Sequence, residues 1–347
     1  MRKALAAGLL LLVTGCVPDF DLDLSVVTAP RVVAVQSRPG EGDEREAIEL
    51  SALVVAPDAA PVPEWALCLE RKPLVELGPI SPLCLDRSRL GTGSLFPLGS
   101  GASVGASVPD QACRLFGPNR PEPKQGEPPG RPVDPDFTGG YYQPVVAFLD
   151  GEIAIGGVRV NCGLSAATPQ KLLDYRDRYR KNENPLLDAV ELMDSNGAAT
   201  RVFPADPAAP ALRVAAGASY TLRASWRACP VVSECGDGIC GAGEDAATCA
   251  ADCTMPHGCT GAEPYVFLDP LTQQLADRRE GILLSWYITA GKFANERTGV
   301  SEADPPATES VNQWTAPAAP GSAALWVVVQ DDRGGTSWTS VALNIGS

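Results

Sequence analysis

The sequence predicts an all-β fold of two β-sandwich domains joined by a short helix, with a disulfide-rich loop insertion in the second domain. Short segments with apolar residues at alternate positions recur along the chain, as expected of strands with one buried face. About 330 residues remain after a cleavable leader, more than one hydrophobic core usually holds. Ten of the 11 cysteines lie beyond residue 16, an even number typical of exported, disulfide-stabilised proteins.

Residues 1–15 have the layout of a signal peptide. Arg2 and Lys3 precede an apolar run that ends just before Thr-Gly-Cys at positions 14–16. This run is about half of the ~20 residues that a membrane-spanning helix needs. The segment LVTGC, which ends at Cys16, resembles the lipobox of bacterial lipoproteins. The resemblance implies a diacylglyceryl-modified Cys16 that anchors the chain to a membrane. An ordinary secretory signal with a chance cysteine is the alternative.

We expect the mature protein in the cell envelope, on a lipid-anchored tether formed by residues 16–30. Val17 follows Cys16 in place of the aspartate that retains many lipoproteins in the inner membrane, which favours the outer membrane. The formal net charge is −14, and an acidic surface repels phosphate backbones and anionic headgroups. We therefore expect no nucleic-acid partner and a membrane contact that depends on the N-terminal lipid.

Residues 31–165 are predicted to form the first domain. Its predicted strands are Arg31–Arg38, Ala47–Ala56, Trp65–Leu69, Gln143–Leu149 and Ile153–Val160. The turn Asp150-Gly151 is predicted to join the last two strands into a hairpin. The Pro- and Gly-rich stretch at about 87–140 is predicted to be either a functional loop or disordered, because it exceeds the ~12 to 15 residues usual for a structureless loop.

Residues 166–183 are predicted to form a helical linker. Thr168 is a suitable N-cap, Pro169 suits the first helical position, and Gln170–Lys181 has the composition of a short exposed helix. Basic residues crowd the C-terminal end, where the helix dipole favours cations. A basic binding patch is the alternative interpretation, although Asp174 and Asp177 interrupt it.

Residues 184–347 are predicted to form the second domain. Its predicted strands are Ala189–Met193, Ala211–Val214, Ser219–Trp226, Ile282–Thr289, Ala324–Gln330 and Trp338–Ile345. The turn-forming stretch 331–336 makes the last two strands a predicted hairpin.

Part of this domain resembles a known family. The segments LSWYITAG at 284–291, WTAP at 314–317 and LWVVVQDDRGG at 325–335 resemble the PKD-like, immunoglobulin-like repeats of bacterial surface proteins. The opening strand PRVVAV at 30–35 is similar to that of predicted lipoproteins of myxobacteria. The resemblance implies immunoglobulin-like sandwiches and an envelope location, and it implies no established activity. The antibody-type spacing of cysteine and tryptophan is absent.

The cysteines beyond the anchor fall into two sets, and their connectivity stays open at the level of sequence. The first set is Cys68, Cys84, Cys113 and Cys162, and the second is Cys229, Cys235, Cys240, Cys249, Cys253 and Cys259. The second set forms a cysteine-rich insert at 229–259. Its run CGDGIC, followed by GED and by an Asp-Cys pair, resembles short cysteine-rich repeats of extracellular bacterial proteins.

Three interpretations of this insert compete. A zinc site is disfavoured because paired C-x2-C knuckles are missing. Calcium is possible, because carboxylates supply the oxygen ligands that Ca²⁺ prefers, although the EF-hand spacing is absent. The candidate ligands are Asp237, Glu244, Asp245 and Asp252. The favoured interpretation is a small disulfide-stapled structural element with solvated acids.

Catalytic motifs are sparse. Gly101–Gly105 matches the G-x-S-x-G pattern of serine hydrolases, with Ser103 as the nucleophile. No strong strand is predicted before this motif and no amphipathic helix after it. The single histidine, His257, would have to complete any Ser-His-acid triad. We therefore expect a protein that is not an enzyme.

Tryptophans are the remaining candidates for recognition. Trp65, Trp226, Trp286 and Trp326 fall within strand patterns and are predicted to fill or cover cores. The other two, Trp314 and Trp338, border loops and are candidates for a surface binding platform. The predicted function is binding, adhesion or scaffolding with an unknown protein or glycan partner. An envelope hydrolase and a purely structural spacer are the alternatives.

Overall fold

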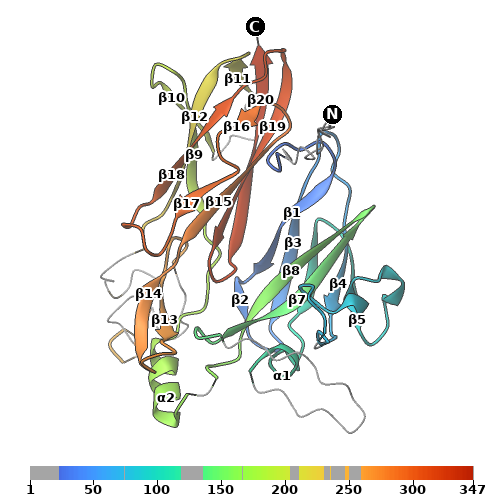
Figure 1. The fold of residues 1–347 in the computed structure, drawn as a ribbon, viewed down its shortest axis with the longest axis vertical. Coiled ribbons are helices and arrows are strands. Elements are labelled where there is room, and N and C mark those ends of the chain that lie inside the picture. Colours follow the sequence, from blue (N-terminus) through green and yellow to red (C-terminus); the bar gives the residue numbers. More distant parts are fainter. Residues whose placement is uncertain are drawn as a thin grey trace, which may run out of the picture.

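The computed structural model describes residues 23–73, 75–118, 136–165, 167–203, 211–229, 235, 247–249 and 259–346. In these residues the protein is mostly β, and four large sheets form two sandwiches (Figure 1). None of the helices in the described ranges has the length and apolar character that a transmembrane helix requires. The predicted signal peptide and Cys16 lie outside these ranges.

The first sandwich packs a three-stranded sheet against a five-stranded one. The first sheet has the order β1-β3-β6, with β1 at Arg31–Arg38, β3 at Ala47–Val55 and β6 at Ser103–Ser107. The other has the order β2-β8-β7-β4-β5, with β2 at Glu41–Gly42, β4 at Glu64–Cys68, β5 at Leu95–Ser100, β7 at Gly140–Leu149 and β8 at Glu152–Asn161. The two sheets bury Leu50, Trp65, Val145 and Val158 between them.

Most predicted strands of this half are confirmed, because their alternation reflects burial on one face. Ile48, Leu50 and Ala52 of β3 point into the core. The predicted hairpin is also confirmed, since β7 and β8 pair from Leu149 and Glu152 outward. Gly151 has a φ of +80°, the left-handed conformation that a tight turn needs and that glycine adopts without strain.

The prediction of a structureless stretch at 87–140 is wrong in its first part. This stretch includes β5, β6 and α1 at Ala112–Phe116, and two 3-10 turns precede β5, at Pro82–Cys84 and Arg87–Arg89. Strand β5 pairs with β4 in one sheet and β6 pairs with β3 in the other, so the chain crosses between the sheets. These edge strands bury few side chains, Leu95 among them, and therefore show little alternation in sequence.

The second sandwich consists of two five-stranded sheets. The first has the order β10-β9-β12-β18-β16, with β9 at Leu187–Met193, β10 at Ala199–Phe203, β12 at Ser219–Trp226, β16 at Lys292–Phe293 and β18 at Glu309–Thr315. The second has the order β11-β20-β19-β15-β17, with β11 at Leu212–Ala215, β15 at Ile282–Ile288, β17 at Arg297–Val300, β19 at Gly321–Asp331 and β20 at Thr336–Gly346. The predicted terminal hairpin of β19 and β20 is confirmed.

Three tryptophans fill the core of this sandwich. Trp226, Trp286 and Trp314 are each at most 2% exposed. The expectation that Trp314 could lie on a surface is therefore wrong. Its strand β18 pairs with β12, its ring stacks on Tyr220, and its indole N–H donates to the carbonyl oxygen of Ala290 at 3.2 Å. Trp338 is half-buried, with Trp326, in a cluster shared with the first sandwich.

The predicted helix exists as α2 at Pro169–Arg178, and the Thr168 side chain caps it by accepting a hydrogen bond from the Lys171 N–H. Tyr175 of α2 and the following Tyr179 pack on Val266 and Leu268. These two residues belong to a hairpin that the sequence did not reveal, β13 at Pro264–Leu268 and β14 at Leu275–Arg279. The domain boundaries, and the role of α2 as a linker, remain predictions.

The two sandwiches contact each other directly. Val27, Ala34 and Leu53 on the side of the first sandwich form a buried cluster with Val328 of the second. The described end of the predicted tether is part of the folded body. Ser25 and Val27 are buried, and both are hydrogen-bonded through their backbones to Ile288 of β15.

Candidate functional site

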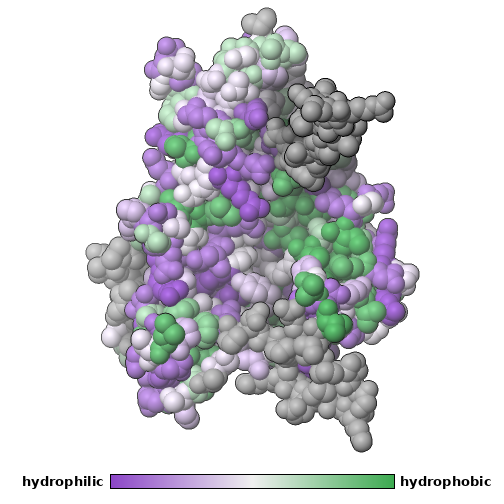
Figure 2. Space-filling view, viewed as in Figure 1, coloured by the Kyte–Doolittle hydropathy of each residue, from purple (hydrophilic) through white to green (hydrophobic). Residues whose placement is uncertain are grey.

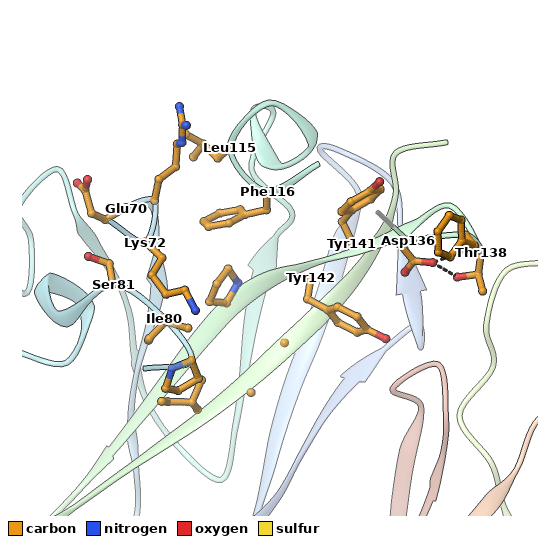
Figure 3. Close-up of a pocket in the computed structure, with 18 of the residues that line it drawn as sticks. Glu70, Lys72, Ile80, Ser81, Leu115, Phe116, Asp136, Thr138, Tyr141 and Tyr142 are labelled. Carbon is orange, nitrogen blue, oxygen red and sulfur yellow. Dashed lines mark hydrogen bonds between the residues drawn. The ribbon is translucent and has the colours of Figure 1, made fainter. Parts of the chain in front are cut away.

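A concave surface of about 780 Å³ lies over the outer face of β7 and β8. We call it the aromatic groove, because five rings line it, those of Phe116, Phe137, Tyr141, Tyr142 and Phe267. In Figure 3 the labelled side chains surround the ribbons of β7 and β8, with Lys72 and Ile80 at one end and Asp136 and Thr138 at the other. The volume of the aromatic groove and its mostly apolar lining are typical of a ligand-binding cleft.

The groove exists because only half of this sheet face is covered. Residues such as Val145 of β7 point into the sandwich core, whereas Tyr142 points outward. Near β4 the loop that follows Cys68 covers the outer face, and Ile80 packs there. Over β8 the outward Ile153 and Ile155 stay 43% and 38% exposed. Figure 2 shows hydrophobic side chains gathered over this part of the first sandwich.

Two disulfides position the walls of the groove. Cys68–Cys84 closes the loop that carries Glu70, Arg71 and Lys72 at one end of the groove. Cys113–Cys162 ties α1 to the end of β8, and α1 carries Leu115 and Phe116. The disulfides therefore fix the site as well as the fold.

The second half of the chain supplies another wall. Phe267 of β13 contacts Phe137 edge-to-face, with 5.8 Å between ring centroids. The guanidinium of Arg278 lies 3.6 Å from the centroid of the Phe267 ring, within the range of a cation–π interaction. The shape of the groove thus depends on how the β13–β14 hairpin sits against the first sandwich.

A cluster of buried charges lies beside the groove floor. We call it the junction cluster, because it joins residues of both sandwiches and of the segment after α2. On the first-sandwich side, the Arg159 guanidinium donates to the Glu41 carboxylate at 3.0 Å and to the Thr138 hydroxyl at 2.7 Å. Glu41 also accepts from the Tyr179 hydroxyl and from the Asn182 N–H. Arg159 and Glu41 are at most 2% exposed.

On the second-sandwich side, Arg333 is the centre of the cluster. Its guanidinium donates to Glu280 at 2.7 Å and also to Glu263. Asp331 accepts from the backbone N–H groups of Arg333 and Gly335. Asn182 connects the two sides, because its amide donates to Asp331 at 3.3 Å.

Burial dominates the electrostatics of this side. It raises the pKa of Glu263 to about 8 and raises the pKa of Glu280 well above its usual range, although the Arg333 guanidinium lowers both. Burial also raises the pKa of Asp331, against the effects of Arg333 and of several hydrogen bonds.

Tyr142 links the junction cluster to the groove. Its ring lines the groove, and its hydroxyl donates to the carbonyl oxygen of Arg333 at 2.7 Å. The Arg159 guanidinium approaches the same hydroxyl at 3.4 Å. Tyr142, on the floor of the groove, is therefore in contact with both Arg159 and Arg333.

The sequence-predicted hydrolase motif does not form a nucleophile elbow. Residues 101 and 102 make the crossing between β5 and β6, and Ser103 begins β6. The motif is therefore a strand–turn–strand, whereas the elbow requires a helix after the turn. The Ser103 hydroxyl lies 2.8 Å from that of Ser51 on an exposed face. His257 lies outside the described residues.

Eight of the predicted disulfide cysteines are paired. Besides the two pairs at the groove, Cys229 joins Cys259 and Cys235 joins Cys249. Cys240 and Cys253 lie outside the described residues. The four candidate calcium ligands, Asp237, Glu244, Asp245 and Asp252, also lie outside them. Within the described ranges no group of three or more acidic, histidine or cysteine side chains has a geometry that could hold a metal ion.

Sequence analysis missed the groove and the junction cluster. The groove combines residues from four separate segments, and the sequence placed part of it in a featureless loop. The sequence signal for the cluster is the run Asp331-Asp332-Arg333, which is followed by two glycines. By itself this run predicts only a turn. Glu263 and Glu280, on either side of an unrecognised hairpin, resemble ordinary surface acids in sequence.

Comparisons with known proteins add little. No family model matches the chain, and no curated protein matches it. Among solved structures, it is similar to fibronectin(III)-like modules of Clostridium thermocellum CbhA, with 12% identity, a TM-score of 0.17 and coverage of 90% of this chain and 94% of that one. The adhesin InvE of Yersinia pseudotuberculosis gives 8% identity, a TM-score of 0.20 and coverage of 90% and 58%.

A third similar structure is the C-terminal domain of the Streptococcus pyogenes antigen I/II-family protein AspA. It shows 11% identity and a TM-score of 0.21, with coverage of 92% of this chain and 99% of that one. Superpositions this poor carry no argument about function. The sandwich architecture described above rests on the sheet topology of the chain itself.

Proposed function

We propose that this chain is a cell-envelope lipoprotein, anchored through lipid on Cys16, that binds a protein or glycan partner in the aromatic groove without catalysing a reaction. The observation that carries the proposal is the groove itself. It leaves Tyr142 and Ile155 41% and 38% exposed on one sheet face. Apolar side chains clustered in this way on a soluble surface usually mark an interaction site.

The groove is built for recognition by shape. Four of its five rings come from β7, from the disulfide-tied α1 and from β13 of the β13–β14 hairpin, so they are held by rigid elements. Rigid aromatic side chains contribute large contact areas at a small cost in conformational entropy. Arg71 and Lys72, against one acid, Glu70, give one end of the groove a net positive charge on an otherwise acidic chain. This end favours a partner with an anionic or strongly polar group.

The finer proposals about family and location rest on the sequence. We propose the type of predicted myxobacterial lipoprotein that combines PKD-like, immunoglobulin-like domains with a CGDGxC-type insert. We also propose the outer membrane as its location, because Val17 follows Cys16. The insert at 229–259 is proposed as a structural element, with calcium binding by its four acids as the alternative.

Binding measurements on the purified chain test the groove. The chain, without residues 1–22, is screened against peptide and glycan arrays. The Tyr142→Ala and Phe116→Ala variants are expected to lose at least about 1 kcal/mol of affinity for any ligand found. Phe96→Ala is the matched control, because Phe96 is a 53% exposed aromatic outside the groove. Equal loss in all three variants, or no ligand in either array, contradicts the proposal and favours a structural spacer.

Protease treatment of intact cells tests the location. Digestion of the wild-type chain on whole cells places the sandwiches outside, and protection until the envelope is opened places them in the periplasm. A Cys16→Ser variant is the untethered control. Unchanged membrane association of this variant contradicts the lipid anchor.

A further inference from the structure

The junction cluster holds more acids than bases. Its two guanidiniums belong to Arg159 and Arg333. Its buried carboxyl groups belong to Glu41, Glu263, Glu280 and Asp331, and each of these residues is at most 8% exposed. Full ionisation would leave an uncompensated negative charge in a region without solvent, which is costly. Two protons on the four carboxyl groups would balance the two guanidiniums.

The hydrogen bonds indicate where these protons reside. Glu41 receives donors on both carboxylate oxygens, and Asp331 receives two backbone N–H groups and the Asn182 amide. One carboxyl oxygen of Glu263, in contrast, is buried with no hydrogen-bond partner among the described residues. An ionised oxygen is poorly accommodated there. Glu280 receives a donor on each oxygen, from the Arg333 guanidinium and from the Glu263 N–H. It shares Arg333 with Glu263, so the two carboxyl groups compete for one cation and the unpartnered oxygen of Glu263 is the site that favours a proton.

Every element packed against this pair contributes charged or titratable groups. The groups that act on the pair or on its arginine are Arg333, Asp331, Glu183, Tyr179, Tyr265 and Arg159. Among the residues that the structure describes, Arg333 is the one cation in direct contact with the two glutamates. Burial and the neighbouring acids raise the pKa of each glutamate by more than the Arg333 guanidinium lowers it, so both pKa values lie above the usual one.

The same cluster holds the groove in place. The Arg333 carbonyl oxygen accepts a hydrogen bond from the Tyr142 hydroxyl, and Tyr142 lines the groove. Glu263 directly precedes β13, which carries Phe267 on the opposite wall. A change in the charge of the Glu263 and Glu280 pair therefore acts on two sides of the groove at once.

We propose that the protonated pair of Glu263 and Glu280 holds Arg333 in the position from which it clamps the two sandwiches together through Tyr142, and that loss of protons at alkaline pH loosens the junction and changes the groove. This inference concerns the regulation of the proposed binding site and rests on the proposed function. The folded state holds these protons more tightly than the unfolded chain does. For Glu263 the stabilising effect is fully present below pH 4.5, the usual pKa of a glutamate, and is lost as the pH rises through about 8. Burial raises the pKa of Glu280 in the same direction.

Amide hydrogen exchange between pH 6 and pH 9, corrected for the intrinsic dependence on pH, tests the clamp. In the wild-type chain, segments 179–184, 331–336 and 140–145 are expected to exchange roughly tenfold faster at the upper end, as for a shift of about one pKa unit. The Glu263→Gln/Glu280→Gln variant mimics the protonated pair and is expected to show no such rise. Glu309→Gln, at an exposed glutamate, is the control and should behave as the wild type does.

A second measurement guards against a double variant that fails to fold. Infrared spectra of the wild-type chain should show a protonated carboxyl signal at pH 7, and the part that belongs to Glu263 should disappear as the pH rises through about 8. Absence of this signal overturns the inference, as does the same exchange profile in the wild type and the double variant. Neither measurement needs a ligand. A clamp that responds to pH in a protein whose groove binds nothing would therefore refute only the proposed function.

Discussion

The two sandwiches solve the same problem of burying sheet faces in different ways. The second sandwich buries Trp226, Trp286 and Trp314 between two five-stranded sheets. The first sandwich pairs three strands with five, buries one tryptophan, Trp65, in its core and carries two disulfides. The described disulfides of the second half lie in the cysteine-rich insert and connect none of its described strands. The half with the smaller core also carries the open face. Disulfides there support a surface that a larger core would have covered.

The largest expected effect comes from emptying one core at a time. Trp286→Ala should destabilise the second sandwich by about 4 kcal/mol, because a fully buried indole leaves a cavity and Thr298 loses its hydrogen-bond donor. Trp65→Ala should cost the first sandwich a similar amount. Calorimetry on both variants should show a different part of the transition moving to lower temperature. A single transition that shifts equally in both would mean that the halves unfold as one unit.

The next effect separates the disulfides of the groove from those of the insert. Cys68→Ser/Cys84→Ser should lower the free energy of unfolding by about 3 kcal/mol, the amount expected for a loop of roughly 15 residues. These two cysteines are 16 positions apart in the sequence. Ligand binding should weaken as well, because the loop carries one end of the groove. Cys229→Ser/Cys259→Ser is the matched control, and it should leave binding at the groove unchanged.

The smallest effect concerns one hydroxyl group in each half. Tyr142→Phe removes the hydrogen bond to the Arg333 carbonyl and should cost about 1 kcal/mol in denaturant unfolding. Tyr220→Phe removes an acceptor of the Ala215 N–H in the second sandwich and should cost a similar amount. Only the first of these substitutions should alter binding at the groove. Equal effects of both on binding would argue that Tyr142 acts through overall stability alone.

Strands in which apolar and polar residues alternate strictly could be predicted from sequence, because burial of one strand face places an apolar residue at every second position. Ser219–Trp226 is one such case and matches β12 residue for residue. The edge strands β5 and β6 could not be predicted from sequence. Each is stabilised mainly by backbone hydrogen bonds to one neighbouring strand, and few of their side chains are buried.

The candidate site was out of reach for a different reason. Glu41 and Arg159 form a buried ion pair across more than a hundred residues of sequence. The sequence does not distinguish a buried acidic residue from an exposed one. In this protein the packing of the β13–β14 hairpin and of the segment after α2 determines which acids are buried. The groove likewise depends on side chains that β7, α1 and β13 bring together, and no local pattern records their proximity.

The short pairing of Ser25 and Val27 with Ile288 has a mechanical consequence. A pull on the N-terminal end of the described chain would load the hydrogen bond from the Leu24 N–H to Glu296 and then the bonds from the Ile288 N–H to the Ser25 carbonyl and from the Val27 N–H to the Ile288 carbonyl. Strand β15, an inner strand between β19 and β17, would carry force before β1 does, although the chain enters β1 first. Tension on the N-terminal end would therefore reach the second sandwich directly, as well as the first.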